Sequence, residues 1–517
     1  MKSRERLDPV TLSVLASALA GIAEEMGAVL IRGAYSSNIK ERRDCSTALF
    51  DGRGRMVAQA EHIPVHLGAM PEAVAAIMRH DPRPGDVFAI NDPYSGGTHL
   101  PDITLVSPVA PGEASEIIGY AVTRAHHSDV GGMRPGSMPS DSREIYQEGI
   151  IIPPLRLVRG GEYVDDILDF ILANVRTPEI RRGDLRAQIA ANRIAEERVG
   201  ELIERRGEEI VLAAFDEVIS YTERRTREAI RELPDGVYRA EDFLEGDGIV
   251  DEDISIRTTV SIKDDSISLN FAGTADSVPG NVNCPLPVTR SACYFALRVL
   301  LPGDVPANAG TYAPLEIRAP QGSLVNAKSP SAVVAGNVET SNRIADVVLA
   351  AFSRAAPLPA QGQGTMNNTI IGGPGWTYYE TIGGGQGASD KGPGPSGVHV
   401  GMSNTLNTPI EAFELEYPMR VERYELLYGS GGEGEHRGGD GIARSVRVLE
   451  PASLSLLTDR RRHGPRGVEG GEPGRVGRNL LNDEELPPKV SRELAEGDVV
   501  TVETPGGGGY GRPEGNA

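Results

Sequence analysis

One short segment of this chain concentrates side chains that are capable of chemistry. Residues 91–132 contain three of the nine histidines together with several carboxylates. Two imidazoles and a carboxylate make a set of nitrogen and oxygen ligands suited to Zn²⁺, Mn²⁺ or Fe²⁺. The segment therefore predicts a divalent metal site that contains His99, Asp102 and one of the pair His126 and His127.

A β-hairpin would bring these residues together. One strand is expected to begin near Asp102 and a second to cover residues 117–125, with Pro111-Gly112-Glu113 as the loop between them. Folding this hairpin about its middle places Asp102 opposite residues 123–127. The two neighbouring histidines then point to opposite faces of the extended chain, so only one can join the cluster. The plainer alternative is a polar hairpin whose histidines are only hydrogen-bonded.

Composition excludes several classes of protein. The 517 residues are enough for about two to four domains. The 52 basic and 73 acidic residues give a net charge of −21, which argues against nucleic acid or an anionic membrane as a partner. Three scattered cysteines fit a reducing cytoplasm. The N-terminus lacks the apolar run of a signal peptide, and we expect no membrane span.

Hydrophobic periodicity predicts an α+β fold, mixed and multi-domain. Apolar residues recur every three or four positions over residues 12–29, which predicts an amphipathic helix, and two long helices are expected within residues 178–233. We expect three regions. They are an N-terminal α+β region with the metal site and the long helices (1–234), an α+β middle region that is loop-rich after residue 302 (235–410), and a β-rich, Gly/Pro-rich C-terminal region (411–517).

Two glycine-rich stretches do not match a nucleotide-binding loop. Residues 383–391 and 504–511 lack the spacing G-x-x-x-x-G-K-[ST] and the strand-to-helix context of that motif. We expect the first to be a structural loop and the second to pack as a turn or to contact a subunit. Cys45 is expected to be a buried, inert thiol.

Several motifs, in order along nearly the whole chain, resemble the hydantoinase B family. They include RRDCSTALFD, EHIPVHLGAM, NDPYSGGTHLPDITLVSPV, RAHHSDVGG, VAGNVETSNRI and TPGGGGYG. The family comprises the B subunits of ATP-dependent hydantoinases and the C-terminal half of 5-oxoprolinases, and it is similar to one subunit of acetone and acetophenone carboxylases. The family often has the pattern HxH where this chain has His399 and Gly401, so the second histidine is missing here.

The resemblance implies a division of labour between two subunits in a hetero-oligomer. An A-type subunit of the actin/sugar-kinase fold would bind ATP and phosphorylate the carbonyl oxygen of a small-molecule substrate. The B-type subunit would complete the reaction at a metal site, which fits the lack of a nucleotide motif here. The implied metal ligands are Asp44, His99, Asp102 and His126, with His127 as the fallback.

Three functions remain open at this point. The leading hypothesis is a cyclic-amide hydrolase of the hydantoinase or 5-oxoprolinase type, with His127 or Asp129 as a general base or an orienting group. The second is a subunit of an ATP-dependent ketone carboxylase, in which the metal stabilises an enolate. The third is a scaffold subunit without catalysis, which retention of the histidines and Asp102 argues against. The motifs leave the substrate, the choice among Mn, Zn and Fe, and the stoichiometry of the complex open.

Overall fold

The N-terminal region is built on a seven-stranded antiparallel sheet. This computed structural model describes residues 7–112 and 116–513. The sheet has the order β2-β1-β5-β4-β3-β6-β7. Its strands are β1 (Cys45–Asp51), β2 (Met56–Glu61), β3 (Val87–Ile90), β4 (Asp102–Val109), β5 (Gly119–His126), β6 (Leu155–Arg159) and β7 (Glu162–Tyr163). The expected hairpin is thus confirmed as β4 and β5, although Glu113 of its loop lies outside the described residues.

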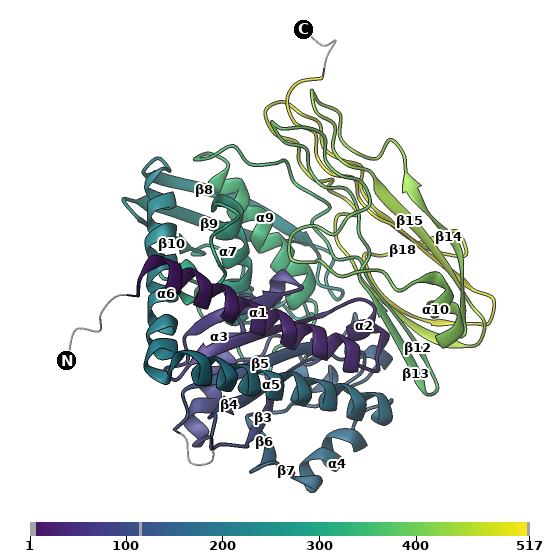
Figure 1. Ribbon diagram of the computed structural model, residues 1–517. Helices are drawn as coiled ribbons and strands as arrows, with labels where there is room; N and C mark the ends of the chain where they lie inside the picture. Colours follow the sequence, from purple (N-terminus) through teal and green to yellow (C-terminus); the bar gives the residue numbers. More distant parts are fainter. Residues whose placement is uncertain (1–6, 113–115, 514–517) are drawn as a thin grey trace.

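Helices α1 (Pro9–Gly33) and α5 (Pro178–Arg206) cover one face of this sheet (Figure 1). Leu19, Met26 and Leu30 of α1 pack with Ala191 of α5 and Leu49 of β1 in one apolar cluster. The predicted amphipathic helix and the predicted pair of long helices are confirmed by α1, α5 and α6. The helices of this region are α1 (Pro9–Gly33), α2 (Ser37–Lys40), α3 (Met70–Ile77), α4 (Asp165–Ala173), α5 (Pro178–Arg206) and α6 (Glu208–Arg231).

Helix α1 is the one described helix that is long and apolar enough to cross a membrane. It begins after Asp8, whose side chain accepts hydrogen bonds from the free amides of Val10 and Thr11. Its buried residues pack on α5 and the sheet, as those of a core helix do. Length and composition alone are therefore weak evidence for a membrane span.

A second layer packs on the opposite face of the sheet. It holds a four-stranded sheet in the order β11-β10-β9-β8, with α7 and α9 packed beside it. One apolar cluster runs from Phe50 and Val122 of the first sheet to Ile256 of β9 and Val348 of α9. The elements are β8 (Gly236–Glu245), β9 (Asp253–Lys263), β10 (Ser266–Asn270), β11 (Leu315–Arg318), α7 (Leu286–Leu300), α8 (Ala309–Tyr312) and α9 (Ser341–Phe352).

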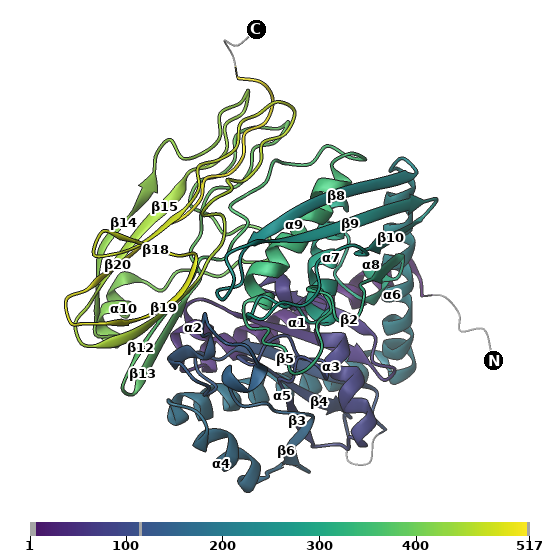
Figure 2. The ribbon, with the colours of Figure 1, turned by 180° about the vertical axis from the view of Figure 1, so that it is seen from behind.

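The C-terminal part is a sandwich of two sheets, which forms a separate lobe seen from behind in Figure 2. The sheets have the orders β13-β12-β16-β19 and β14-β15-β20-β17-β18. The elements are β12 (Asn368–Gly373), β13 (Trp376–Glu380), α10 (Ile410–Glu416), β14 (Met419–Leu427), β15 (Gly441–Val448), β16 (Ala452–Leu457), β17 (Arg478–Leu481), β18 (Glu484–Leu486), β19 (Lys489–Leu494) and β20 (Val499–Glu503).

The region 302–410, expected to be loop-rich, also contains α9, β12 and β13. Strand β12 pairs with β16, so one sheet joins residues on both sides of position 410. The expected region boundaries at 234 and 410 stay predictions.

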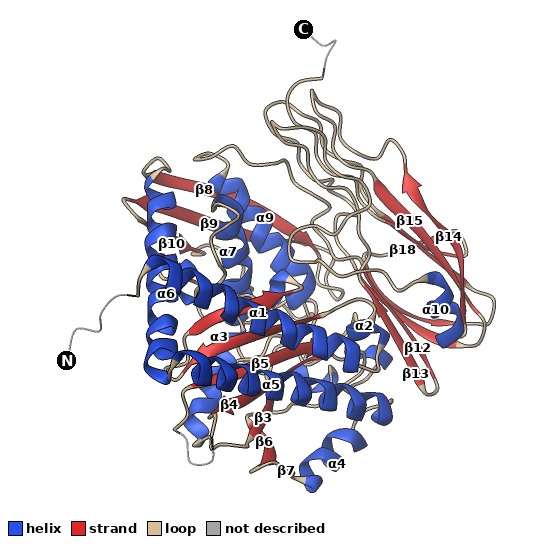
Figure 3. Ribbon diagram, in the orientation of Figure 1, coloured by secondary structure: helices blue, strands red, loops and turns tan. Residues whose placement is uncertain are grey.

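Glycine-rich segments extend from the sandwich as long stretches without regular secondary structure (Figure 3). A Cβ atom at Gly385 would lie 2.1 Å from the carbonyl oxygen of Gly439, and one at Gly507 would lie 2.1 Å from that of Gln386. The amide of Gly507 donates to Gly439 at 2.9 Å, so the same segments are hydrogen-bonded. Residues 504–509 are buried between other backbones, which corrects the expectation of a turn there.

Candidate metal centre

Asp102 and His126 face each other across the β4–β5 hairpin. The two residues are direct partners in the antiparallel register. Asp102 Oδ1 lies 3.3 Å from His126 Nδ1 and 3.0 Å from His99 Nε2, and the two ring nitrogens lie 3.2 Å apart. All three side chains are buried. The structure therefore brings together three of the residues that the sequence selected, each offering one atom to the same point.

A tightly packed loop delivers His99 to this point. The side chain of Asn91 donates to the carbonyl of Leu100 at 2.7 Å and accepts from the amide of Ile152 at 2.7 Å. The backbone of Gly97 approaches Asn91 so closely that a Cβ atom would lie 2.2 Å from its carbonyl oxygen. Residues after β3 are thereby fixed across the end of the sheet, where loops commonly carry function.

The two histidines each direct one ring nitrogen at the carboxylate. His99 Nδ1 lies 3.4 Å from the carbonyl oxygen of Val334, which accepts a hydrogen bond from an Nδ1–H of that ring. Burial lowers the pKa of His126, so this ring is neutral at neutral pH. Two ring nitrogens and one carboxylate oxygen thus converge, and protons or a cation must lie between them for the group to be stable.

Asp102 carries the negative charge of the cluster. Burial opposes its ionisation, but electrostatic attraction to His99 and hydrogen bonds from His126, His66 and His99 outweigh burial and hold its pKa well below the usual range. Its second oxygen, Oδ2, accepts a hydrogen bond from Thr98 Oγ1 at 2.6 Å. The carboxylate is therefore ionised and oriented before any ligand arrives.

The three atoms fit a divalent cation. His99 Nε2, Asp102 Oδ1 and His126 Nδ1 are separated by 3.0 to 3.3 Å. Ligand atoms bonded at about 2.1 Å to one tetrahedral cation lie about 3.4 Å apart, which is close to the observed spacing. Among the described residues, His99, Asp102 and His126 form a group of His, Cys, Asp or Glu side chains whose ligand atoms lie close enough together to hold a metal ion. Two imidazoles and a carboxylate suit Zn²⁺, Mn²⁺ or Fe²⁺.

A third imidazole, that of His66, also contacts Asp102. It lies in the short helix η1 (Pro64–His66), with Nε2 3.6 Å from Asp102 Oδ2 and Nδ1 3.0 Å from Ser46 Oγ. The carboxylate thus has imidazoles on both oxygens. His66 and Asp102 are 36 positions apart in the sequence, so only the tertiary packing of η1 brings the two together.

Asp44 lies beside the cluster but outside the converging group. Its carbonyl oxygen accepts the amide hydrogen of His126 at 3.0 Å, and its side chain is buried. The negative charge of Asp44 acts to raise the pKa of His126, although burial outweighs it. Its carboxylate oxygens are not part of the close-spaced set formed by His99, Asp102 and His126.

His127 and Asp129 point into other hydrogen-bond networks. His127 Nε2 lies 3.0 Å from Gln188 Oε1 on α5, and burial lowers the pKa of His127 to about 4. The carboxylate of Asp129 accepts hydrogen bonds at 3.0 Å from the amides of Gly131 and Gly136 and from Arg176. Asp129 therefore holds the turn that follows β5, and His127 connects the end of β5 to α5.

Two further sequence features are explained by local packing. Cys45 is buried, and burial raises the pKa of its thiol, which confirms the expected inert cysteine. Gly401 has a φ of 68°, and a Cβ atom there would lie 2.7 Å from Asn342 Oδ1. A histidine at this position would therefore have a strained backbone and would require the Asn342 side chain to shift.

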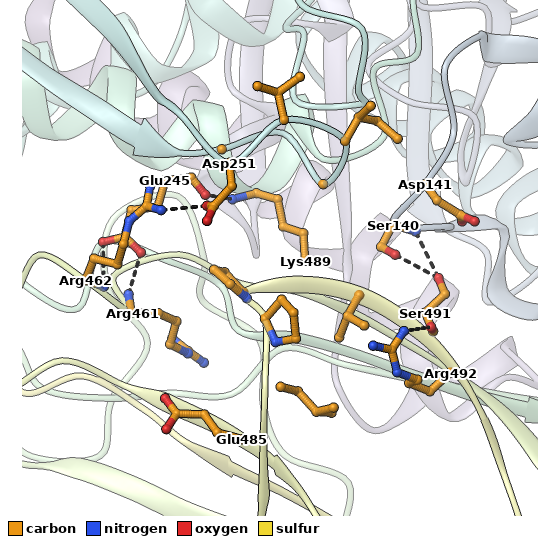
Figure 4. Close-up of a pocket in the computed structure, with 18 residues that line it drawn as sticks. Ser140, Asp141, Glu245, Asp251, Arg461, Arg462, Glu485, Lys489, Ser491 and Arg492 are labelled. Carbon is orange, nitrogen blue, oxygen red and sulfur yellow. Dashed lines mark hydrogen bonds and ion pairs between the residues drawn. The ribbon is translucent and has the colours of Figure 1, made fainter.

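A large cavity lies away from the metal cluster, between the middle region and the sandwich (Figure 4). Its volume is about 670 Å³, and none of the cluster residues lines it. Its polar side chains pair with one another, such as Arg462 with Asp251 at 2.6 Å and Ser140 with Ser491 at 2.8 Å. The cavity therefore offers few uncommitted charges for chemistry.

The chain belongs to the hydantoinase B/oxoprolinase family, whose model matches residues 8–513. An uncharacterized protein of Methanocaldococcus jannaschii is 43% identical over 98% of this chain and 91% of its own length. The putative B-type subunit of a D-/L-hydantoinase from a Pseudomonas species is 34% identical over 98% of this chain and 91% of its own length. 5-Oxoprolinase 1 of Arabidopsis thaliana is 39% identical over 98% of this chain. The match covers only 42% of the length of that longer protein.

Two solved structures share the fold. The ATP-dependent caprolactamase of Pseudomonas jessenii superposes with a TM-score of 0.90 at 29% identity, covering 99% of this chain and 93% of that chain. Acetone carboxylase in its nucleotide-free form gives a TM-score of 0.88 at 19% identity, covering 98% of this chain and 76% of that chain. The second likeness shows the fold alone.

Proposed function

We propose that this chain is the B-type subunit of an ATP-dependent hydrolase of cyclic amides. The observation that carries the proposal is the convergence of His99, Asp102 and His126 on one buried point. Relatives named as 5-oxoprolinases and as part of a hydantoinase, and the structural likeness to an ATP-dependent caprolactamase, support this substrate class. An A-type subunit of the actin/sugar-kinase fold is the proposed partner and the proposed site of ATP binding.

The chemistry requires activation because an amide carbonyl is a poor electrophile. Phosphorylation of the carbonyl oxygen by the partner converts the lactam to an imidate phosphate. Water adds to the activated carbon, the ring nitrogen leaves with a proton, and a second water releases phosphate from the resulting acyl phosphate. A divalent cation bound by His99, Asp102 and His126 supplies Lewis acidity that makes water reactive at neutral pH.

The residues of this chain prepare the site for that task. Asp102 provides a fixed negative charge, because Thr98 and His66 hold its second oxygen away from the cluster. His99 and His126 direct Nε2 and Nδ1 at the same point, and burial lowers the pKa of His126, so this ring carries no net charge that would repel a cation. Their burial excludes bulk water, which strengthens every electrostatic interaction in the site.

We keep Asp44 as a proposed fourth ligand, since its side chain is buried next to His126. For His127 and Asp129 we propose an orienting role, because Gln188 and Arg176 already engage their polar atoms. The proposed function therefore does not depend on either residue as a general base.

A carboxylase function is the second proposal, since acetone carboxylase shares the fold. The higher identity to 5-oxoprolinases and to caprolactamase favours hydrolysis. The convergent cluster argues against a purely structural role for the chain.

The test reconstitutes the chain with a candidate A-type partner subunit. We expect ATP-dependent ring opening of 5-oxoproline, hydantoin or caprolactam, with ADP formed in proportion to product. Parallel reactions with acetone or acetophenone and labelled bicarbonate test the carboxylase function. Turnover of the ketones alone would overturn the hydrolase assignment, and no turnover of either class would favour the scaffold.

A further inference from the structure

The two histidines of the metal cluster are held in different ways. A metal-binding histidine usually donates its second ring N–H to a carbonyl or carboxylate, which fixes the ring orientation. His99 follows this rule, with Nδ1 directed at the carbonyl of Val334. His126 does not, because its Nε2 is buried and has no hydrogen-bond partner. Some other contact must therefore orient the ring of His126.

That contact is a face-to-face stack with Tyr379. The ring centroids of His126 and Tyr379 lie 4.3 Å apart, with 14° between the ring planes. Both side chains are buried. Tyr379 lies on β13 of the C-terminal sandwich, which faces α2 and the N-terminal sheet in both views (Figures 1 and 2). The sandwich thus supplies one wall of a site whose ligands all come from the N-terminal region.

Tyr379 is itself fixed by a short hydrogen-bond chain. Its hydroxyl donates to Asn368 Oδ1 at 2.9 Å, and Asn368 Nδ2 donates to Glu339 Oε1 at 3.0 Å. Glu339 also accepts the amide of Met366 at 3.1 Å. Glu339 belongs to η5 (Gly336–Thr340), a π-helical turn that runs into α9. Such turns are rare and occur frequently at functional sites.

We propose that Tyr379, held by Asn368 and Glu339, is the positioning residue of His126. The aromatic stack takes the place of the missing hydrogen bond and fixes the direction of Nδ1 toward Asp102 and His99. This inference rests on the proposed metal site and extends it to residues more than 200 positions away in the sequence. The C-terminal sandwich therefore sets the affinity and geometry of a cation bound in the N-terminal region.

The test measures Co²⁺ binding to the full-length chain by visible absorption, together with Zn²⁺ affinity by competition. Tyr379→Leu removes the stack, and we expect about 10- to 100-fold weaker binding and an altered Co²⁺ spectrum. Tyr379→Phe keeps the stack and loses one hydrogen bond, so its loss should be no more than about fivefold. The spectrum reports ligand geometry, which a merely structural role of Tyr379 would not change in the folded protein.

Tyr378 provides the matched control. It neighbours Tyr379 on β13 but packs against Phe413 and Tyr417 inside the sandwich. Tyr378→Phe should bind Co²⁺ as the unmodified chain does. If Tyr379→Leu does not fold, Asn368→Ala, which frees the tyrosine hydroxyl, should alter the spectrum in the same direction as Tyr379→Phe.

The outcomes separate this inference from the function on which it rests. An unmodified chain that binds Co²⁺, with Tyr379→Leu equal to it in affinity and spectrum, overturns the positioning role alone. Unchanged spectra in both Tyr379→Phe and Asn368→Ala overturn the part of the proposal in which Asn368 and Glu339 hold Tyr379 in place. An unmodified chain that binds neither Co²⁺ nor Zn²⁺ overturns the metal site and this inference together.

Discussion

At the scale of single residues, Asp102 organises the site because its two oxygens have different partners. Oδ1 faces His99 and His126, whereas Oδ2 is held by Thr98 and approached by His66. A carboxylate fixed in this way costs little reorganisation when a cation binds.

The first prediction is that His99→Ala removes most of the bound divalent metal. The substitution deletes one of three converging ligand atoms and leaves an incomplete site. Elemental analysis of protein purified without chelator should show near-stoichiometric metal in the unmodified chain and a large loss in the variant. His463→Ala is the control, since that partly exposed ring pairs with Asp253 on the surface. Equal metal content in His99→Ala and the unmodified chain would contradict the site.

The close approach of His99, Asp102 and His126 could be predicted from sequence because it is local. The short loop of a hairpin fixes the register of the two strands that it joins. The observed pairing of Asp102 with His126 falls within the predicted range. The contacts of His66 and Tyr379 could not be predicted, because they depend on how distant segments pack. The roles of Asp44, His127 and Asp129 stay predictions.

At the scale of elements, the glycine-rich segments are the part of the fold that most restricts which residue can occupy a position. Their backbones approach so closely that a Cβ atom at Gly507 would lie 2.1 Å from the carbonyl oxygen of Gln386. The carbonyl oxygen of Gln386 belongs to the backbone and is not the end of a flexible side chain. The backbone itself would therefore have to move to make room for a Cβ atom at Gly507. Glycine is required here by packing rather than by a nucleotide.

We therefore predict that Gly507→Ala destabilises the protein by about 1–3 kcal/mol, the usual cost of overpacking. Gly303→Ala is the matched control, because no atom lies within 4 Å of a Cβ atom at Gly303. Thermal or denaturant unfolding of both variants gives the comparison. Equal stability of Gly507→Ala and the unmodified chain would show that these segments move apart readily.

Elements with a clear period could be predicted, and elements buried on all sides could not. Helices α1, α5 and α6 each have a solvated face, which gives the sequence its 3.6-residue pattern. Helix α9 is buried nearly all round, with β-branched Val347 and Val348 inside, so its segment carries little helical signal. Strand β12 ends in Gly372 and Gly373, which the sequence suggests as a loop.

At the scale of the whole molecule, the site lies where separate layers meet. Asp102 and His126 come from β4 and β5 and His99 from the loop before β4, Val334 and Glu339 come from the middle region, and Tyr379 comes from the sandwich. No single layer builds the complete environment of the cluster. This arrangement fits a protein whose chemistry depends on the relative placement of its parts.

The third prediction is that the isolated chain neither binds nor hydrolyses ATP appreciably. The amides of its glycine-rich segments are already used, as Gly508 donates to Gln361 and Gly509 donates to Glu472. No phosphate-cradling loop of known spacing is present in the sequence. Isothermal calorimetry with the chain alone should show no binding, whereas the reconstituted complex should bind ATP. Micromolar affinity of the isolated chain would overturn the proposed division between subunits.

The last prediction concerns how the chemistry divides between the two subunits. If the metal centre acts after phosphorylation, Asp102→Asn should spare substrate-stimulated ATP cleavage more than ring opening, because it keeps the size of the side chain and removes the charge that attracts the cation. Loss of such an electrostatic contribution costs about 10²-fold or more in turnover. The variant is reconstituted with its A-type partner, and phosphate and ring-opened product are measured in the same reaction. Asp251→Asn, whose carboxylate is 83% exposed, serves as the control and should change neither rate. Equal loss of phosphate release and of ring-opened product in Asp102→Asn would mean that the metal is needed for substrate binding, before ATP is cleaved. A centre that acts only on the phosphorylated ring cannot slow the phosphorylation that forms this ring.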